Sequence, residues 1–274
     1  MKQKQKKEKA TKQRTSFRPN NKVWFAAPFV IFLMLMVVIP LGLLFYYAFA
    51  SDGGASANFG HVFGTTGYMR MIGISLGIAL FAATIAVLIA YPIAYGLSMV
   101  GFKRVPTILL LFIAPMWINL LLRSFALDQF YELIGLGRGF WALIIALVID
   151  YLPLAILPMY VALSGINKKF IEASYDLGAT RGQMFRKTVL PLSVPGIITG
   201  FLLVFTPVMS TYFLSMYFGT NETRMIGEML NVYVENHILG IASVIAMVIL
   251  VIILFAFIVA NRLSKIGNKR GGVW

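Results

Sequence analysis

Residues 140–164 read FWALIIALVIDYLPLAILPMYVALS, and this stretch sets the fold class of the chain. Its 25 residues contain a single charged side chain, Asp150. About 20 helical residues, at a rise of about 1.5 Å each, cross the roughly 30 Å hydrocarbon layer of a bilayer. A spanning strand would need only about 10 residues of alternating polarity, which this stretch does not show. The stretch therefore predicts a transmembrane helix.

Further apolar stretches of similar length lie on both sides of it. They are residues 23–49, 71–100, 105–122, 192–218 and 238–260. We therefore expect an all-α polytopic membrane protein with six transmembrane helices. The composition agrees, because 59% of the chain is hydrophobic and only 12% is charged, whereas a soluble domain carries about 25% charged residues. This excludes an ordinary soluble enzyme.

The basic residues predict how the chain is oriented in the membrane. Of 24 Lys and Arg, 20 fall on one side if both termini are cytoplasmic, which is the pattern of the positive-inside rule. The net charge of +14 is then a topology signal and does not indicate nucleic-acid binding. We expect basic cytoplasmic tails at 1–22 and 263–274. The apolar run 23–49 is too long for a removable signal peptide and is expected to stay as the first transmembrane helix.

The cytoplasmic loop over residues 167–191 reads NKKFIEASYDLGATRGQMFRKTVLP. Asn167 can cap a short helix that ends near Gly178, since glycine readily takes a left-handed conformation. Thr180 and Gln183 have the capping-box spacing for a second helix. Several side chains fall on one face of the first helix, namely Phe170, Ile171, Ser174 and Leu177. Such a helix, apolar on one face and charged on its flank, suits a groove of another protein.

Six residues of this loop stand at a distinctive spacing. They are Glu172, Ala173, Ser174, Gly178, Leu190 and Pro191. The spacing resembles the EAA loop in permease subunits of ATP-binding cassette (ABC) importers. In that family EAA is followed by three residues, G, nine residues and I-x-L-P. Here Ser174 replaces the third alanine and Thr188 replaces the isoleucine. The resemblance implies a type I ABC permease domain over 67–262, whose loop docks in a cleft of an ATPase subunit and transmits the closure of that subunit.

Other segments narrow the resemblance. Residues 117–124, 151–160, 190–200 and 225–227 are similar to permease subunits of spermidine/putrescine importers, more to the PotB type. This implies a polyamine permease of the cell membrane. The implied partners are an ATPase subunit dimer, a second homologous permease, an extracytoplasmic polyamine-binding protein and membrane lipid. ATP and Mg²⁺ would be held by the ATPase, with no cofactor and no nucleic acid on this chain.

Asp150 is the only acid inside an apolar stretch, near the middle of its span. Such acids usually face a wet cavity or a partner, because an isolated charge in the bilayer costs several kcal/mol. A polyamine needs carboxylates for its ammonium groups and aromatic faces for cation–π contact. Asp150, with Tyr151 and Trp117, is therefore the candidate substrate pathway. The alternative, left open here, is that Asp150 is a protonated or hydrogen-bonded packing residue between helices.

The remaining polar residues indicate neither a catalytic nor a metal site. The dipeptide Gly-Lys never occurs, which excludes a GxxxxGK[ST] phosphate loop, and cysteine is absent. His61 and His237 stand alone in outer loops. Arg123 is expected to pair with Asp128 or to contact lipid headgroups. The outer loops carry six acids, the first of which is Asp52. The other five could receive a basic binding protein or draw in cations, but solvation is their expected role: Asp128, Glu132, Glu222, Glu228 and Glu235.

Two further hypotheses stay open. The same permease fold could carry another small cation or an oxyanion, although the one embedded charge is acidic and favours a cation. The chain could also be a membrane scaffold or sensor without transport, in which case residues 172–191 would have no ATPase to bind. Two GxxxG pairs, at 73–77 and 196–200, are interpreted as sites of close helix packing.

Overall fold

The computed structural model describes residues 22–50, 53–100 and 104–271. All regular elements in these ranges are helices. The chain divides into two units, residues 1–46 and 47–274. The first contains most of α2 (Lys22–Ala50), which agrees with the transmembrane helix expected at 23–49. The tail expected at 1–22 lies outside the described residues except for its last residue, as do residues 272–274 of the second tail and the outer acid Asp52.

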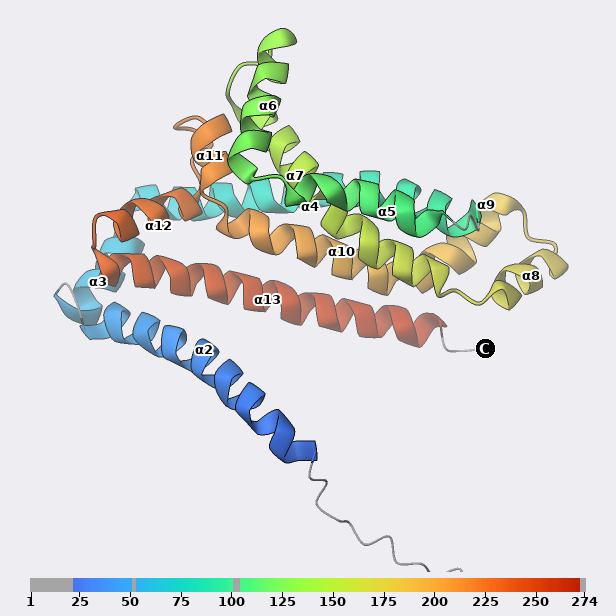
Figure 1. Cartoon of the computed structure of the whole chain (residues 1–274), viewed down its shortest axis with the longest axis horizontal. Helices are drawn as coiled ribbons and strands as arrows, with labels where there is room; N and C mark the ends of the chain where they lie inside the picture. The colour runs from blue at the N-terminus through green and yellow to red at the C-terminus, as the bar shows by residue number, and fades with distance from the viewer. Residues whose placement is uncertain (1–21, 51–52, 101–103, 272–274) are drawn as a thin grey trace, which may run out of the picture. The chain divides into compact units, whose positions relative to one another are not determined.

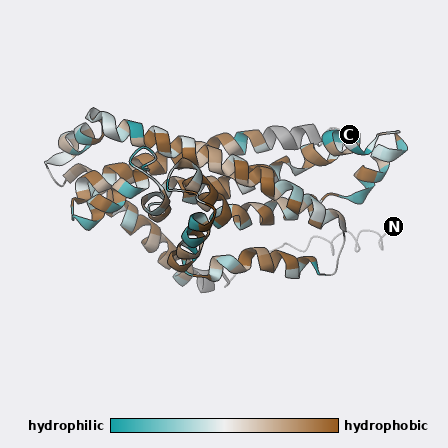
Figure 2. Cartoon of the chain, turned by 90° about the horizontal axis from the view of Figure 1, so that it is seen from above, coloured by the Kyte–Doolittle hydropathy of each residue, from teal (hydrophilic) through white to brown (hydrophobic). Residues whose placement is uncertain are grey.

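Four long helices form the bundle of the second unit (Figure 1). They are α4 (Thr66–Val100), α7 (Phe140–Ser164), α10 (Leu190–Ser210) and α13 (Leu239–Gly271). Helix α7 packs against both α4 and α10, and α13 packs against α10. Figure 2 shows hydrophobic residues along the length of these helices. One face of α4 is buried through alanines at helical spacing, which let the neighbouring backbones approach closely: Ala79, Ala82, Ala83, Ala86, Ala90 and Ala94.

Most of the predicted spans are confirmed. Helix α7 has the predicted bounds, 140–164, α4 covers the predicted 71–100, and α13 covers the predicted 238–260 except for its first residue. In the described part of the chain, five helices are long and apolar enough to cross a membrane, and a bent pair makes a sixth if it is counted as one span.

The expected continuous helix over 105–122 is wrong, because the chain breaks there. Helix α5 (Val105–Ile113) and the 3-10 turn η1 (Ala114–Trp117) end at an extended Ile118, and α6 (Leu120–Leu133) leaves at 95°. Pro115 has no N–H for the helix, and Asn119 starts α6 by accepting a hydrogen bond from the Leu121 N–H at 2.8 Å. Hydropathy does not detect such a break, because most residues on both sides of it, as far as Leu122, are apolar.

The expected span over 192–218 is also divided. Helix α10 ends at Ser210, Thr211 is extended, and a separate short helix α11 (Phe213–Phe218) follows. Short helices α3 (Gly54–Gly64) and α12 (Ile226–Glu235) lie at one end of the bundle, while α8 (Lys168–Asp176) and α9 (Arg181–Met184) lie at the other (Figure 1). The long helices therefore connect two ends, of which the α8 end carries the predicted coupling loop.

Candidate functional site

The predicted loop helix forms as α8, and both of its predicted ends are confirmed. The side chain of Asn167 accepts a hydrogen bond from the Lys169 N–H at 3.0 Å. After α8, Gly178 has a φ of 79°, the left-handed region that glycine tolerates, and its N–H donates to the Tyr175 carbonyl at 2.8 Å. The sequence thus defines a short helix with fixed ends on the predicted cytoplasmic side.

The second predicted helix begins with the predicted capping box. The Thr180 N–H donates to Oε1 of Gln183 at 3.0 Å, and the Gln183 N–H donates to Oγ1 of Thr180 at 3.4 Å. Helix α9 then continues through a π-helical segment η2 (Phe185–Val189) into α10, as one helix over Arg181–Ser210. The sequence did not predict the π segment. Such segments occur often at functional sites, and this one joins the loop directly to a bundle helix.

A groove of about 680 Å³ separates α8 from η2 and the start of α10. Leu177 and Phe170, at its α8 side, are 89% and 51% exposed. The lining residues are Phe170, Ala173, Ser174, Leu177, Ala179, Gln183, Lys187, Thr188, Pro191 and Leu192. Three of the four residues predicted to share an apolar face line this groove, whereas Ile171 packs against the bundle core. Apolar side chains exposed at a polar end of the molecule are typical of a partner-binding surface.

The motif residues occupy two surroundings. Glu172 and Ala173 are exposed on α8, whereas Leu190 and Pro191 are half-buried at the start of α10. Ser174, also half-buried, faces the η2 segment, and its hydroxyl lies 2.8 Å from that of Thr188. The motif therefore spans an outward-facing surface and a contact with the bundle.

Asp150 is buried in the middle of α7, where its side chain is 3% exposed. The Nε atom of Arg123, on α6, lies 2.6 Å from Oδ1 of Asp150. The contact is a close ion pair between the guanidinium and the carboxylate. Among the described residues, Oδ2 of Asp150 has no hydrogen-bond partner. The charge of Asp150 is thus balanced from within the chain.

The predicted pairing of Arg123 with Asp128 is therefore wrong. Arg123 instead reaches Asp150, and its Nη1 donates to the Pro115 carbonyl at 3.0 Å, which ties α6 to the break that precedes it. Asp128 accepts a hydrogen bond from the Tyr217 hydroxyl at 3.2 Å. The 95° turn of α6 explains the difference, because it is the fold and not the sequence spacing that brings Arg123 to α7.

The other candidate pathway residues are placed differently. Tyr151 is half-buried beside Asp150 on α7 and lies near Thr211. The Trp117 side chain is 81% exposed at the end of η1. The structure therefore keeps Tyr151 next to Asp150 and leaves Trp117 on the surface of this chain. Their role toward a substrate stays a prediction.

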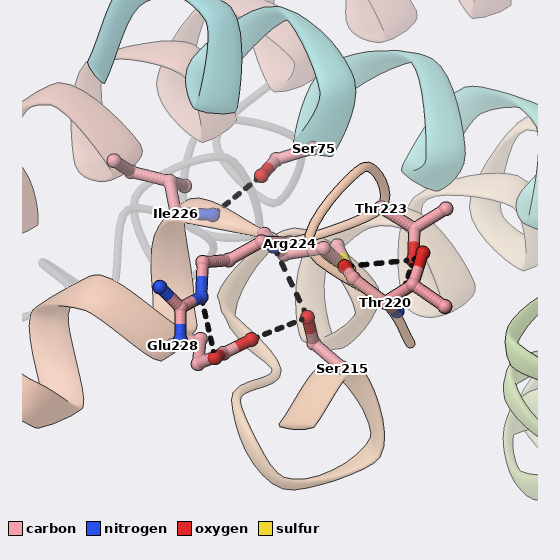
Figure 3. A network of polar contacts seen from close by, with 8 residues as sticks. Ser75, Ser215, Thr220, Thr223, Arg224, Ile226 and Glu228 are labelled. Carbon is pink, nitrogen blue, oxygen red and sulfur yellow. Dashed lines mark hydrogen bonds and ion pairs between the residues drawn. The ribbon is translucent and has the colours of Figure 1, made fainter. Parts of the chain in front are cut away.

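A buried polar network joins α4, α11 and α12 (Figure 3). The Ser215 hydroxyl donates to Oε2 of Glu228 at 3.1 Å and accepts a hydrogen bond from the Met225 N–H at 3.1 Å. The Nε atom of Arg224 donates to Oε1 of Glu228 at 2.7 Å. Glu228 is 7% exposed, so the expectation that it is solvated is wrong. Its i, i+4 spacing from Arg224 was the available signal.

Ser75 closes this network from α4. Its hydroxyl accepts a hydrogen bond from the Ile226 N–H at 2.7 Å, and its side chain is fully buried. Residues 73–77, GISLG, also match the GxSxG pattern of hydrolase nucleophiles. That chemistry needs an exposed serine on a strand-to-helix turn, whereas Ser75 lies inside a long helix. The match is therefore structural.

His61 is isolated in sequence but not in the fold. Its Nε2 lies 3.2 Å from the Tyr68 hydroxyl and 3.4 Å from that of Tyr233, and the two tyrosine hydroxyls contact each other. The cluster joins α3, α4 and α12 at the end of the bundle opposite α8. Its hydroxyls and ring nitrogen are occupied with one another, which is consistent with a packing role.

Comparisons with known proteins agree with this architecture. A family model described as "Binding-protein-dependent transport system inner membrane component" matches residues 11–265. The spermidine/putrescine transport system permease protein PotB of Escherichia coli K12 is 31% identical over 194 residues, which cover 64% of this chain and 70% of that protein. The PotC permease of the same strain is 28% identical over 142 residues, covering 50% of this chain and 53% of that protein.

Two solved structures are similar in fold. A bacterial ABC transporter that imports the acidic polysaccharide alginate aligns with a TM-score of 0.71 at 17% identity, covering 89% of this chain and 96% of that chain. The MetNI methionine ABC transporter aligns with a TM-score of 0.59 at 18% identity, covering 73% and 95%. At these identities the likeness concerns the fold alone.

Proposed function

The chain belongs to the family of binding-protein-dependent transport system inner membrane components, and we propose that it is the polyamine-translocating permease subunit of an ABC importer. It is a multi-pass membrane protein and not an enzyme, since the ATPase of such importers is a separate subunit. The observation that carries the proposal is the inner loop, in which α8 and its exposed apolar side chains stand on a helix continuous with α10.

The proposed mechanism passes force through this loop. Two ATPase subunits would hold ATP and Mg²⁺, and one of them would grip α8. Closure of the ATPase dimer would move α8 and, through η2, the inner end of α10. Rocking of packed helices against a second permease would then alternate outward and inward openings. An extracytoplasmic binding protein would deliver the substrate at the α12 end.

Polyamine as cargo is supported by the relatives that match this chain, PotB and PotC, both of which are named for spermidine and putrescine transport. The embedded carboxylate of Asp150 is the group on this chain that suits an ammonium, with Tyr151 and Trp117 as the proposed aromatic contacts. Because Arg123 holds that carboxylate, a substrate ammonium would reach it only when α6 or α7 moves. Asp150→Asn should lower polyamine uptake while membrane assembly is kept, and unchanged uptake would contradict this role.

The proposed function is tested with the importer assembled from this permease, its partner permease, the ATPase and the binding protein in proteoliposomes. Spermidine or putrescine should stimulate ATP hydrolysis and accumulate inside, while neutral and anionic solutes should not. Stimulation by an anion alone would overturn the polyamine assignment and leave the ABC permease in place. Failure of any ATPase to purify with the chain through α8 would instead favour the scaffold or sensor alternative.

A further inference from the structure

The two positions at which this chain departs from the EAA pattern contact each other. Ser174, which replaces the third alanine, lies on α8, and Thr188, which replaces the isoleucine, lies in the π segment η2. Their hydroxyl oxygens are 2.8 Å apart, a hydrogen-bond distance. The residues are 14 positions apart in sequence and lie on opposite walls of the same groove. The two substitutions therefore act as one feature of the loop.

The direction of this hydrogen bond follows from proton counting. The Ser174 hydroxyl has one proton, and it donates to the Phe170 carbonyl one turn earlier, at 2.7 Å. The contact with Thr188 must then be made by the Thr188 proton, which Ser174 accepts. The result is a series of two hydrogen bonds that runs from the Thr188 hydroxyl through the Ser174 hydroxyl to the backbone of α8. Both side chains are half-buried, which shields the bond from water.

The bond crosses the turn between α8 and the next helix. After α8 the chain turns at Gly178, in the left-handed region, before Thr180 starts the next helix. A groove of about 680 Å³ separates the two arms on one side of the contact. A displacement of α8 can therefore be absorbed by the turn, or it can reach η2 through side-chain contacts between the arms. The Ser174–Thr188 bond is a side-chain hydrogen bond that joins them.

We propose that Ser174 and Thr188 are positioning residues whose hydrogen bond transmits the movement of α8 to α10. This rests on the proposed function, because it assumes that an ATPase moves α8. Thr188 is suited to the task since it lies in η2, within the single helix that becomes α10. The pair would set how much uptake each ATP drives, and not whether the ATPase binds.

The test compares variants in the complete reconstituted importer, with spermidine uptake measured per ATP hydrolysed. Ser174→Ala and Thr188→Val should each lower this ratio by about two- to tenfold, the factor that corresponds to one ordinary hydrogen bond. The double variant with both changes should be no worse than either single one. Ser174→Ala combined with Thr188→Ile restores the family pattern and should recover the ratio, and Thr188→Ser should keep it. Thr199→Val is the matched control, because its hydroxyl bonds only the Pro195 carbonyl of its own helix.

The outcomes separate this inference from the proposed function. Unchanged ratios in both single variants, or losses that add in the double variant, would overturn the transmission role. Loss of the ATPase from the purified Ser174→Ala complex would also overturn it, by showing that the pair serves attachment. If the unmodified importer shows no ATP-driven uptake, the proposed function fails. In that case amide hydrogen exchange still tests whether the Ser174–Thr188 bond holds α8. If it does, the α8 amides should exchange faster in Ser174→Ala and Thr188→Val than in Thr199→Val.

Discussion

Arg123 and Asp150 form an ion pair between α6 and α7, with 2.6 Å from Nε to Oδ1. The acid is almost fully buried, whereas the arginine side chain is 18% exposed. The pair thus attaches a helix that turns 95° away from its predecessor to the middle of the bundle. This unequal burial leads to the first prediction.

Arg123→Gln should destabilise the protein more than Asp150→Asn. The first change leaves a buried carboxylate without its counter-charge, which costs about 3–5 kcal/mol, while the second leaves an arginine that can reach water or headgroups. Thermal unfolding of the purified protein in detergent measures the difference. The Arg123→Gln/Asp150→Asn double variant should be more stable than Arg123→Gln alone, and a double variant that is less stable would show that the pair does not act as a unit.

Ser215→Ala should destabilise the α11–α12 region by about 1–3 kcal/mol, because the Met225 N–H and the buried Glu228 carboxylate each lose a partner. Hydrogen exchange should show the effect as faster exchange of the α12 amides. Ser210→Ala is the control, since that exposed hydroxyl bonds only carbonyls of its own helix. Equal exchange in the two variants would contradict a clamping role for Ser215.

Gly196→Ala should destabilise the α7–α10 contact by about 1–3 kcal/mol. A methyl group there would collide with Cβ of Ala162 and lie 3.0 Å from the Pro158 carbonyl oxygen. Gly73→Ala should be nearly neutral, because a methyl group at Gly73 or Gly77 meets nothing within 4 Å, so the close packing expected at 73–77 is not found within the described part of this chain. The midpoints of thermal unfolding of the two variants measure the difference. An equally large loss of stability in Gly73→Ala would show that Gly73 packs against another subunit.

The predicted orientation can be tested by cysteine labelling, since the chain has no cysteine of its own. Lys169→Cys, on exposed α8, should react with a membrane-impermeant maleimide only from the cytoplasmic side. Glu222→Cys, exposed near the opposite end, should react only from outside. Labelling of Lys169→Cys in intact cells would show that the chain has the opposite orientation, and it would remove the basis for ATPase docking at α8. The unmodified chain is the background control.

The sequence predicted the features that depend on local chemistry. The bounds of α7 are those of an apolar run between two glycines, and the caps at Asn167 and Thr180 follow from side chains that bond their own backbone. Features set by the fold were not predictable. The break at Ile118 falls within the apolar run 105–122, which hydropathy does not divide, and the turn of α6 brings Arg123 to Asp150.

The same limit applies to the candidate site. Ser174 and Thr188 were each recognised as departures from a motif, but one sequence contains no information that they touch. The burial of Glu228 depends on the return of α12 to α4, where the Ile226 N–H bonds Ser75. Ranges of apolar residues and capping patterns thus locate the elements, while charge partners require the packed structure.

The glycine contact between α7 and α10 has a consequence for motion. At Gly196 and Gly200, backbone atoms of α7 and the side chains of Ala162 and Met159 fill the space where a side chain of α10 would stand, so the two helices lie in close contact. Helices packed this closely resist sliding and twisting relative to each other, so α7 and α10 should move as one rigid unit. A rotation imposed on the cytoplasmic end of this rigid unit should then appear as a rotation of similar angle beyond Ser210, where the chain turns into α11.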